Sequence, residues 1–291
     1  MLFSSRVVQM LFVLLQHLLP HHLLSRITGW LAQQSTPWLK NALIKQFIRS
    51  FNVDMSEAVD PEPNSYRNFN AFFTRQLKEG ARPVSAEPDT IASPADGAVS
   101  QLGRIEVGCL LQAKNHWYSA GDLLGDDALA REFHGGQFAT VYLSPRDYHR
   151  VHMPVGGSLR ETRYIPGKLF SVNQTTAENV ARLFARNERL VCIFDTEHGP
   201  MAMVLVGAMI VAGIETVWSG QIAPAGQQVQ TQRFGQAADH VSLDKGDEMG
   251  RFQLGSTVIL LFPENVVAWD ATLEAGSKLR MGQQIARYSA P

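Results

Sequence analysis

The chain has 291 residues, of which 45% are hydrophobic and 18% are charged, so it can bury a sizeable core. Its formal net charge of −1 is unevenly spread, because residues 1–50 hold five basic residues and no acidic one. This pattern favours an anionic membrane surface as a partner, and the lack of a basic aromatic patch argues against nucleic acid. Cys109 and Cys192 form no CxxC motif, which fits a reducing compartment and leaves a single disulfide open.

The first apolar segment begins at residue 7 and closes at Pro20, with polar interruptions at Gln9, Gln16 and His17. A helix that spans a bilayer needs about 20 mainly apolar residues, and this segment falls short. A cleaved signal peptide is the main alternative, with Arg6 as its basic start, but no small-x-small cleavage site precedes the proline.

Two more helical patterns follow, and each places its apolar residues on one face by spacings of three and four. They comprise Leu23, Leu24, Ile27, Trp30 and Leu31, and then Trp38, Leu39, Leu43, Ile44, Phe47 and Ile48. We expect residues 1–60 to form a membrane-associating helical segment that lies in the plane of one leaflet. The alternative is that these helices simply pack on the body of the protein.

The proline-rich stretch of residues 60–64 links this segment to a second domain, residues 61–291. A short helix is predicted at 69–77, and beyond Pro83 short apolar runs alternate with turn residues, as in a β-rich domain. The predicted strands include 98–102, 138–143, 190–195, 201–206, 216–218 and 257–262, and helices are predicted at 123–132 and 176–185. The apolar run 201–214 is interpreted as two buried strands around a glycine turn. The predicted fold is therefore α+β, with N-terminal amphipathic helices followed by a β-rich body.

A Gly-Ser step, Gly255-Ser256, stands directly before the apolar run 257–262. The hydroxyl of Ser256 can attack the carbonyl carbon of Gly255, since glycine has no side chain to block it and tolerates strained backbone angles. If the resulting ester eliminates, Ser256 becomes the N-terminus of a new chain and carries a pyruvoyl group. Taken alone, such a step before a strand is more often an ordinary turn.

Four further stretches occur in a fixed order before this step. They read Phe69-Asn70-Ala71-Phe72-Phe73-Thr74-Arg75 with Leu77-Lys78 and Arg82-Pro83, then Ser93-Pro94-Ala95-Asp96-Gly97, then Leu143-Ser144-Pro145-Arg146-Asp147-Tyr148-His149-Arg150-Val151-His152-Met153-Pro154, and finally Pro166-Gly167-Lys168-Leu169-Phe170-Ser171-Val172-Asn173. With the Gly-Ser step, they make the chain resemble the bacterial, compact form of the pyruvoyl-dependent phosphatidylserine decarboxylases. The resemblance runs from about residue 69 to the C-terminus.

The resemblance implies an autocleavage triad of Ser256 as nucleophile, His152 as base and Asp96 as the residue that orients the base. It also implies that His149 donates the proton in decarboxylation. Each residue has a structural alternative: Asp96-Gly97 can be a hairpin turn, and two histidines three apart point to opposite faces of a flat strand. His149, His152 and Asp147 could also bind a metal, but no cysteine or glutamate completes a ligand set, so none is expected.

The same resemblance implies cleavage between Gly255 and Ser256 into a large chain, 1–255, and a small pyruvoyl chain, 256–291. The pyruvoyl group would form a Schiff base with phosphatidylserine and act as the electron sink for its decarboxylation to phosphatidylethanolamine, so no separate cofactor is required. It further implies a homodimer of the cleaved chains, at the cytoplasmic face of a bacterial inner membrane. Ser171 and Asn173 could bind the headgroup or form ordinary turns, and Tyr142 and Phe170 could line the pocket or belong to the core.

Two other classes of protein remain open from the sequence. A membrane-bound serine hydrolase could use Ser256, His152 and Asp96 on an external ester, although the chain lacks a Gly-x-Ser-x-Gly elbow. A non-catalytic β-domain that binds lipid headgroups would not depend on Ser256 at all.

Overall fold

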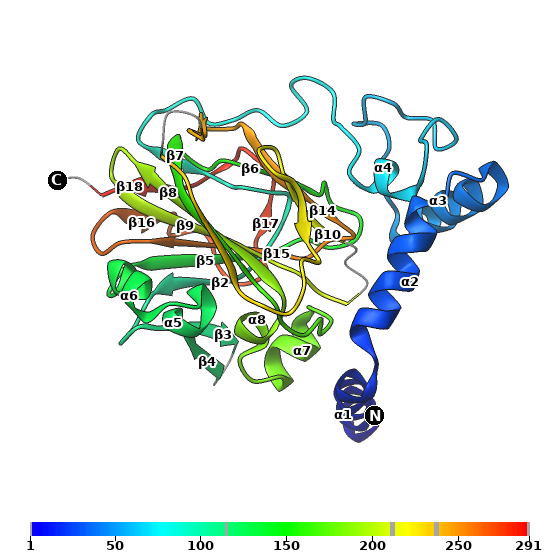
Figure 1. Cartoon of the computed structure of the whole chain (residues 1–291), viewed down its shortest axis with the longest axis horizontal. Coiled ribbons are helices and arrows are strands. Elements are labelled where there is room, and N and C mark those ends of the chain that lie inside the picture. Colours follow the sequence, from blue (N-terminus) through cyan, green and yellow to red (C-terminus); the bar gives the residue numbers. More distant parts are fainter. Residues whose placement is uncertain (1, 114–115, 210–212, 236–238, 290–291) are drawn as a thin grey trace.

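A computed structural model describes residues 2–113, 116–209, 213–235 and 239–289 (Figure 1). The N-terminal part forms helices α1 (Leu2–Leu18), α2 (His21–Gln33) and α3 (Pro37–Phe51). Pro20 separates α1 from α2, and Pro37 occupies the first turn of α3, where its missing N–H costs no hydrogen bond. Within the described ranges, no helix has the length and apolar character needed to cross a bilayer.

The body is built on a large antiparallel sheet of nine strands (Figure 1). Its path runs through β12 (Gln230–Arg233), β7 (Gly157–Ile165), β8 (Arg189–Thr196), β9 (Gly199–Val206), β15 (Thr257–Phe262), β5 (Gln137–Tyr142), β2 (Gly97–Arg104) and β17 (Lys278–Leu279), and β13 (Ser242–Leu243) also pairs with β7. The strand β15 follows Ser256 directly and lies in the middle, with β5 on one side and β9 on the other. The candidate cleavage point is therefore tied to the centre of the fold.

This sheet separates two hydrophobic cores, because successive side chains of a strand point to opposite faces. In β15, Val258, Leu260 and Phe262 enter one core while Ile259 and Leu261 enter the other. All six residues of the strand are buried, which explains why it reads as a continuous apolar run.

Two smaller sheets cover the first core. One has the order β11 (Gly220–Ala223), β10 (Gly213–Thr216), β14 (Glu248–Gln253), β6 (Arg150–His152), and the other has the order β1 (Thr90–Ala92), β18 (Gln284–Tyr288), β16 (Val267–Trp269). The second core is covered by the hairpin β3 (Cys109–Ala113) and β4 (His116–Ser119) and by the short helices α5 (Ala120–Leu124), α6 (Asp127–Ala130), η1 (Arg131–Phe133), α7 (Gln174–Asn179) and α8 (Leu183–Arg186). The predicted α+β class, with helices first and a β-rich body after them, is confirmed.

Several predicted boundaries differ from the structure for local reasons. The helix expected at 123–132 is broken, because Gly125 ends α5 in the left-handed conformation and Asp126 caps α6 anew. The helix expected at 176–185 divides at Val180, whose backbone is extended. The strand expected at 216–218 is wrong, since β10 ends at Thr216 and a turn leads to β11. In the apolar run 201–214, residues 201–206 belong to β9 and residues 213–214 belong to β10. Residues 210–212 lie outside the described part.

A third hydrophobic cluster joins the N-terminal helices to the body. It combines Ile44 of α3 with Phe69, Phe72 and Phe73 of α4 (Phe69–Phe73), a helix shorter than the one expected at 69–77. Leu254, two residues before Ser256, packs against this cluster. The helical segment therefore abuts the Gly-Ser step.

Candidate active site

The Gly-Ser step forms a corner between two sheets. The strand β14 ends at Gln253 in the four-stranded sheet, and β15 begins at Thr257 in the nine-stranded sheet. Leu254 and Gly255 make the turn with φ of 75° and 67°, both in the left-handed region. That conformation is natural for glycine but costs a leucine roughly 1–2 kcal/mol. The chain thus holds strained backbone immediately before Ser256.

Ser256 is buried at this corner, with 3% of its surface exposed. Its backbone carbonyl accepts a hydrogen bond from the amide of Leu143 at 2.8 Å, which anchors the start of β15 beside the end of β5. Its hydroxyl lies 3.3 Å from the hydroxyl of Thr257. The nucleophile predicted from the sequence is therefore fixed in position and shielded from bulk water.

His149 lies against the other side of the corner. Its ring packs on Phe73 at a centroid distance of 4.0 Å, and its Nδ1 is 2.8 Å from the carbonyl oxygen of Asp147. Because a carbonyl only accepts, Nδ1 carries the proton in the neutral ring and the lone pair is on Nε2. A Cβ built on Gly255 would come within 2.9 Å of that Nε2, so the lone pair faces the Gly-Ser step.

The imidazole of His149 is fully buried, and its Nε2 has no hydrogen-bond partner in the described part of the chain. Burial lowers the pKa of His149 to about 3, a change opposed by the Asp147 carbonyl and reinforced by the charge of Arg75. The ring is therefore neutral at physiological pH. Buried polar atoms without a hydrogen-bond partner are rare in folded proteins, and one beside a strained peptide indicates a catalytic role for His149.

His152 faces a different set of groups. Its Nδ1 lies 2.8 Å from the carbonyl oxygen of Gly246, and its Nε2 lies 3.2 Å from the hydroxyl of Tyr148. The Gly246 carbonyl fixes the proton on Nδ1, so Nε2 is the acceptor for Tyr148. Burial lowers the pKa of His152 as well, although the Gly246 carbonyl and the nearby carboxylates of Glu248 and Asp96 oppose the change.

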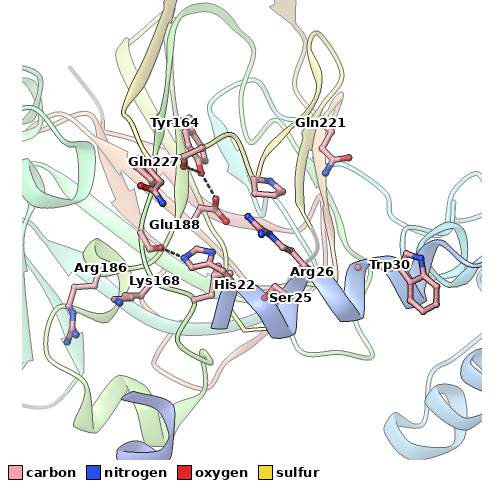
Figure 2. Close-up of a pocket in the computed structure, with 16 residues that line it drawn as sticks. His22, Ser25, Arg26, Trp30, Tyr164, Lys168, Arg186, Glu188, Gln221 and Gln227 are labelled. Atoms are coloured by element: carbon pink, nitrogen blue, oxygen red, sulfur yellow. Dashed lines mark hydrogen bonds between the residues drawn. The ribbon is translucent and has the colours of Figure 1, made fainter. Parts of the chain in front are cut away.

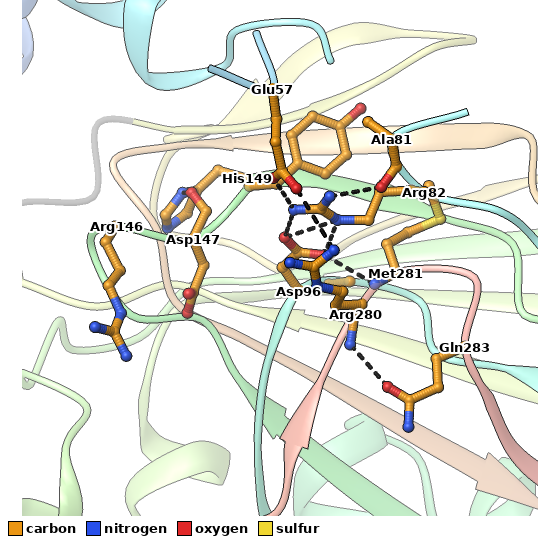
Figure 3. Close-up of polar contacts among 12 residues, drawn as sticks. Glu57, Ala81, Arg82, Asp96, Arg146, Asp147, His149, Arg280, Met281 and Gln283 are labelled. Carbon is orange, nitrogen blue, oxygen red and sulfur yellow. Dashed lines mark hydrogen bonds and ion pairs between the residues drawn. The ribbon is translucent and has the colours of Figure 1, made fainter. Parts of the chain in front are cut away.

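Asp96 is held by an arginine that lies between it and Glu57 (Figure 3). Arg82 donates from Nε to both carboxylate oxygens, at 2.8 and 3.0 Å, and from Nη2 to Oδ2 at 2.6 Å. The amide of Met281 donates to Oδ1 at 2.8 Å. Burial alone would lower the pKa of Arg82, but its hydrogen bonds to Asp96 and Glu57 outweigh that effect and raise it.

The structure brings some of the predicted residues together and leaves others apart. His149 faces the Gly255-Ser256 step, and the charge of Asp96 acts on the pKa of His152. The two segments are also joined by a backbone hydrogen bond from the His152 amide to the carbonyl of Pro94, at 2.8 Å. Among the described residues, no direct hydrogen bond joins Asp96, His152 and Ser256 to one another. The four assigned roles stay predictions.

Sequence reasoning missed several groups that shape this site. Arg82 was visible only as part of Arg82-Pro83, and nothing in that pair indicates that its partner is Asp96. Arg75 is 5% exposed, its Nε has no partner in the described part of the chain, and its charge acts on His149. Tyr148 lies within the motif of residues 143–154, but neither that motif nor the sequence around Gly246 indicates that these two residues are the partners of His152.

The four residues expected near a substrate have structural duties. Phe170 is buried in the second core and packs on His17 and His21, and Tyr142 is half-buried at the end of β5. Asn173 is the N-cap of α7, where its side chain accepts from the amide of Thr176, and its amide donates to the Ser171 hydroxyl at 3.2 Å. Across the ranges the structure describes, no three acidic, histidine or cysteine side chains gather to hold a metal ion.

Comparison with known proteins places the chain among named relatives. A family model described as phosphatidylserine decarboxylase matches residues 69–287, and one described as PSD matches residues 11–52. The chain is 62% identical over 281 residues to a phosphatidylserine decarboxylase proenzyme of Azotobacter vinelandii, covering 96% of this chain and 98% of the relative. The proenzymes of Pseudomonas fluorescens and Saccharophagus degradans are 60% and 57% identical, over 94% and 95% of this chain and 96% of each relative.

These matches define the chain as a carboxy-lyase of phospholipid metabolism, made as a proenzyme. It belongs to the phosphatidylserine decarboxylase family, and it converts phosphatidylserine to phosphatidylethanolamine. The resemblance drawn from the sequence motifs is confirmed.

Proposed function

We propose that the chain activates itself by breaking the bond between Gly255 and Ser256, and that Ser256 then carries the pyruvoyl group used in decarboxylation. One observation carries the proposal: the lone pair of His149 Nε2 faces a strained, left-handed glycine directly before a buried serine. A merely structural corner gains nothing from an unsatisfied buried nitrogen. Such a nitrogen is expected where a proton is later moved.

The proposed cleavage balances as an acyl shift followed by elimination. The hydroxyl oxygen of Ser256 bonds to the carbonyl carbon of Gly255 while the peptide C–N bond breaks, which leaves an ester and a free amine. Loss of the Cα proton of residue 256 and cleavage of its Cβ–O bond release residues 1–255 with a carboxylate and leave a dehydroalanine. Water hydrolyses the imine tautomer of that residue to a ketone and ammonia. His152 removes the serine proton, and Asp96 stabilises the resulting imidazolium. Because Tyr148 occupies His152 Nε2 in the uncleaved chain, its hydroxyl has to relay this proton or swing aside.

The residues around the corner fit a ketone at position 256. In the intact chain Ser256 is buried, and the unpaired His149 Nε2 lies beside the step that precedes it. A pyruvoyl carbonyl, conjugated with the following amide, supplies an electron sink for loss of CO2. His149 can donate a proton only after gaining one at Nε2, which burial opposes in the intact chain. Release of residues 254 and 255 would admit water, relieve this burial and raise the pKa toward a useful value.

The two cleaved chains should remain together. The small chain, 256–291, contains β15, which is paired along its length with β5 and β9 of the large chain. Its last strand, β18, is paired with β1, also of the large chain. We therefore propose a stable pair of large and small chains, and by family resemblance a homodimer of that pair, which light scattering after size exclusion would measure.

We further propose that residues 1–60 form a helical unit that places the body, residues 61–291, against the cytoplasmic face of a bacterial inner membrane as a peripheral protein. Helices α1 to α3 expose large apolar side chains to solvent, including Leu14, Leu18, Ile27, Trp30 and Trp38. Exposed apolar faces of this kind, with basic residues nearby, are typical of helices that lie in a membrane interface. A chain that lacks residues 1–50 should fail to sediment with anionic vesicles. Full sedimentation of that shortened chain would contradict the assignment.

Intact-mass analysis of the purified protein tests the proposed self-cleavage. The wild type should give two masses that correspond to residues 1–255 and 256–291, with the second chain lacking a free amine at its N-terminus. Ser256→Ala should give one chain and no decarboxylation of phosphatidylserine. A single chain with an unmodified Ser256 in active wild-type enzyme would overturn the proposal.

A further inference from the structure

A cavity lies where α2 meets the body, and its lining contains none of Asp96, His149, His152 or Ser256 (Figure 2). Its volume is about 790 Å³. One wall is a single face of α2, and the other walls come from the segment after β7, the end of α8 and the segment that follows β11. At this cavity α2 contacts the body through His22, whose Nε2 lies 3.0 Å from the carbonyl oxygen of Gly167.

The rim of this cavity is positively charged. Arg26 of α2, Lys168 and Arg186 all line it, and within the described ranges none of the three forms an ion pair. Arg186 also lies over the ring of Phe170, 4.7 Å from its centroid, which limits its freedom. Figure 2 shows Arg26 reaching from α2 toward the interior of the cavity. Unpaired cations from both walls form a natural receptor for a phosphate.

The interior holds a group of the opposite sign. Glu188 is only 6% exposed, and its carboxylate accepts a hydrogen bond from the hydroxyl of Tyr164 at 2.5 Å. Among the described residues, no cation lies within ion-pair distance of that carboxylate, and burial raises the pKa of Glu188. A buried carboxylate without a counter-ion is costly, so a bound ammonium would be favoured there.

The mouth of the cavity adjoins an apolar stripe. The cavity-lining residues His22, Arg26 and Gly29 occupy one face of α2. Leu23, Ile27 and Trp30 follow the neighbouring face by the same spacing, and Trp30 also lines the cavity. These three apolar side chains are 55%, 48% and 63% exposed. If that stripe lies in the membrane interface, the cavity opens at the level of the lipid headgroups.

We propose that this cavity binds the headgroup of a zwitterionic phospholipid with a primary ammonium, phosphatidylethanolamine, separately from the site at Ser256. The phosphate lies between Arg26 and Lys168, and the ammonium donates to Glu188. Phosphatidylserine is disfavoured, because its additional carboxylate would meet the carboxylate of Glu188. Phosphatidylcholine can satisfy the phosphate contacts, but its quaternary ammonium has no proton to donate. The bound lipid pins α2 to the body and so fixes the body at the membrane, using the product of the reaction as its ligand.

Vesicle sedimentation tests the proposal in the full chain with Ser256→Ala, so that no pyruvoyl group can capture an amine. The probes are vesicles of phosphatidylcholine alone and vesicles that contain equal parts of phosphatidylcholine and phosphatidylethanolamine, phosphatidylserine or phosphatidylglycerol. Binding to the phosphatidylethanolamine vesicles should be at least about tenfold tighter than to phosphatidylcholine alone, as expected for one additional hydrogen bond between charged groups. Hydrogen exchange in α2 should slow on the same vesicles.

Three variants separate this site from general membrane attraction. Glu188→Gln retains an acceptor for Tyr164 and should erase the preference for phosphatidylethanolamine over phosphatidylcholine, while it leaves or strengthens binding to phosphatidylglycerol. Arg26→Gln should weaken binding to both zwitterionic vesicles. Lys45→Gln removes one charge from the exposed face of α3 and should preserve the preference. Equal binding to the phosphatidylethanolamine and phosphatidylcholine vesicles, or a preference that Glu188→Gln leaves unchanged, would overturn the proposal. Neither outcome bears on whether Ser256 is the cleavage site.

Discussion

Arg82 encloses the carboxylate of Asp96 with three hydrogen bonds, and both side chains are nearly inaccessible, with 8% and 9% of their surfaces exposed. The same Nη2 that bonds Asp96 also donates to the carboxylate of Glu57, 2.8 Å away, in the segment that connects the N-terminal helices to the body. Arg82 therefore fixes the rotamer of the residue proposed to orient His152. It also ties that residue to the helical part of the chain.

Arg82→Gln should destabilise the protein and slow its self-cleavage. Removing one partner of a buried ion pair typically costs about 3–5 kcal/mol, because the remaining carboxylate stays buried without its counter-charge. Arg82→Lys retains the charge but cannot form the two-pronged contact, so its effect should be intermediate. Urea unfolding in a Ser256→Ala background measures stability, and gel analysis of newly made protein measures cleavage.

Arg104→Gln is the matched control for this prediction. Arg104 also pairs with a carboxylate, that of Glu264, but these side chains are 57% and 49% exposed. Pairs of that kind contribute at most about 1 kcal/mol. If Arg82→Gln were as mild as Arg104→Gln in both assays, the ion pair with Asp96 would have no special part in processing.

The burial of His149 predicts a dependence of stability on pH. The unfolded chain binds a proton at this residue with a pKa of 6.5, whereas in the folded chain the pKa is about 3. Between these values the unfolded state binds more protons, so the free energy of unfolding falls as the pH drops below 6.5. At pH 5 this residue lowers the free energy of unfolding by about 2 kcal/mol. Well above pH 6.5 it does not lower it, because the residue is neutral in both states.

His149→Gln should remove that loss. In the Ser256→Ala background, urea unfolding between about pH 7 and pH 5 should show a shallower decline for the variant than for its parent. Part of the decline should remain, because burial lowers the pKa of His152 in the same direction. Parallel declines in the two proteins would show that His149 is accessible to protons in the folded chain.

The strand β15 and the Gly-Ser step could be predicted from the sequence, because each depends only on residues that are adjacent in the chain. A fully apolar run before turn residues indicates a buried central strand, as found. The contact between Arg82 and Asp96, 14 residues apart, depends on how the chain returns to β17 and Met281, and no local pattern encodes that path. The partner of His152 Nδ1 is similarly a backbone carbonyl, Gly246, which any residue could supply.

Substitutions of Asn173 can distinguish its role as the N-cap of α7 from a role in binding the substrate headgroup. Its side chain caps α7 and takes part in a reciprocal capping box with Thr176. Asn173→Ser should retain the cap, while Asn173→Ala should lose about 1 kcal/mol of stability. If capping is its only duty, both variants should cleave themselves and the serine variant should keep the wild-type KM for phosphatidylserine. A raised KM in the stable serine variant would instead assign the amide to the headgroup.

Gly255→Ala should block self-cleavage through contact as well as through backbone strain. At its φ of 67° any side chain costs roughly 1–2 kcal/mol, and the added Cβ would come within 2.9 Å of His149 Nε2. Gly220 provides the control, since its φ is 66° and a Cβ there would meet nothing within 4 Å. Gly220→Ala should therefore carry the same backbone cost without touching the site. Gel analysis should show uncleaved chain for Gly255→Ala and two chains for Gly220→Ala. Should Gly255→Ala process as completely as Gly220→Ala, the close approach of His149 to the scissile peptide would have no bearing on cleavage.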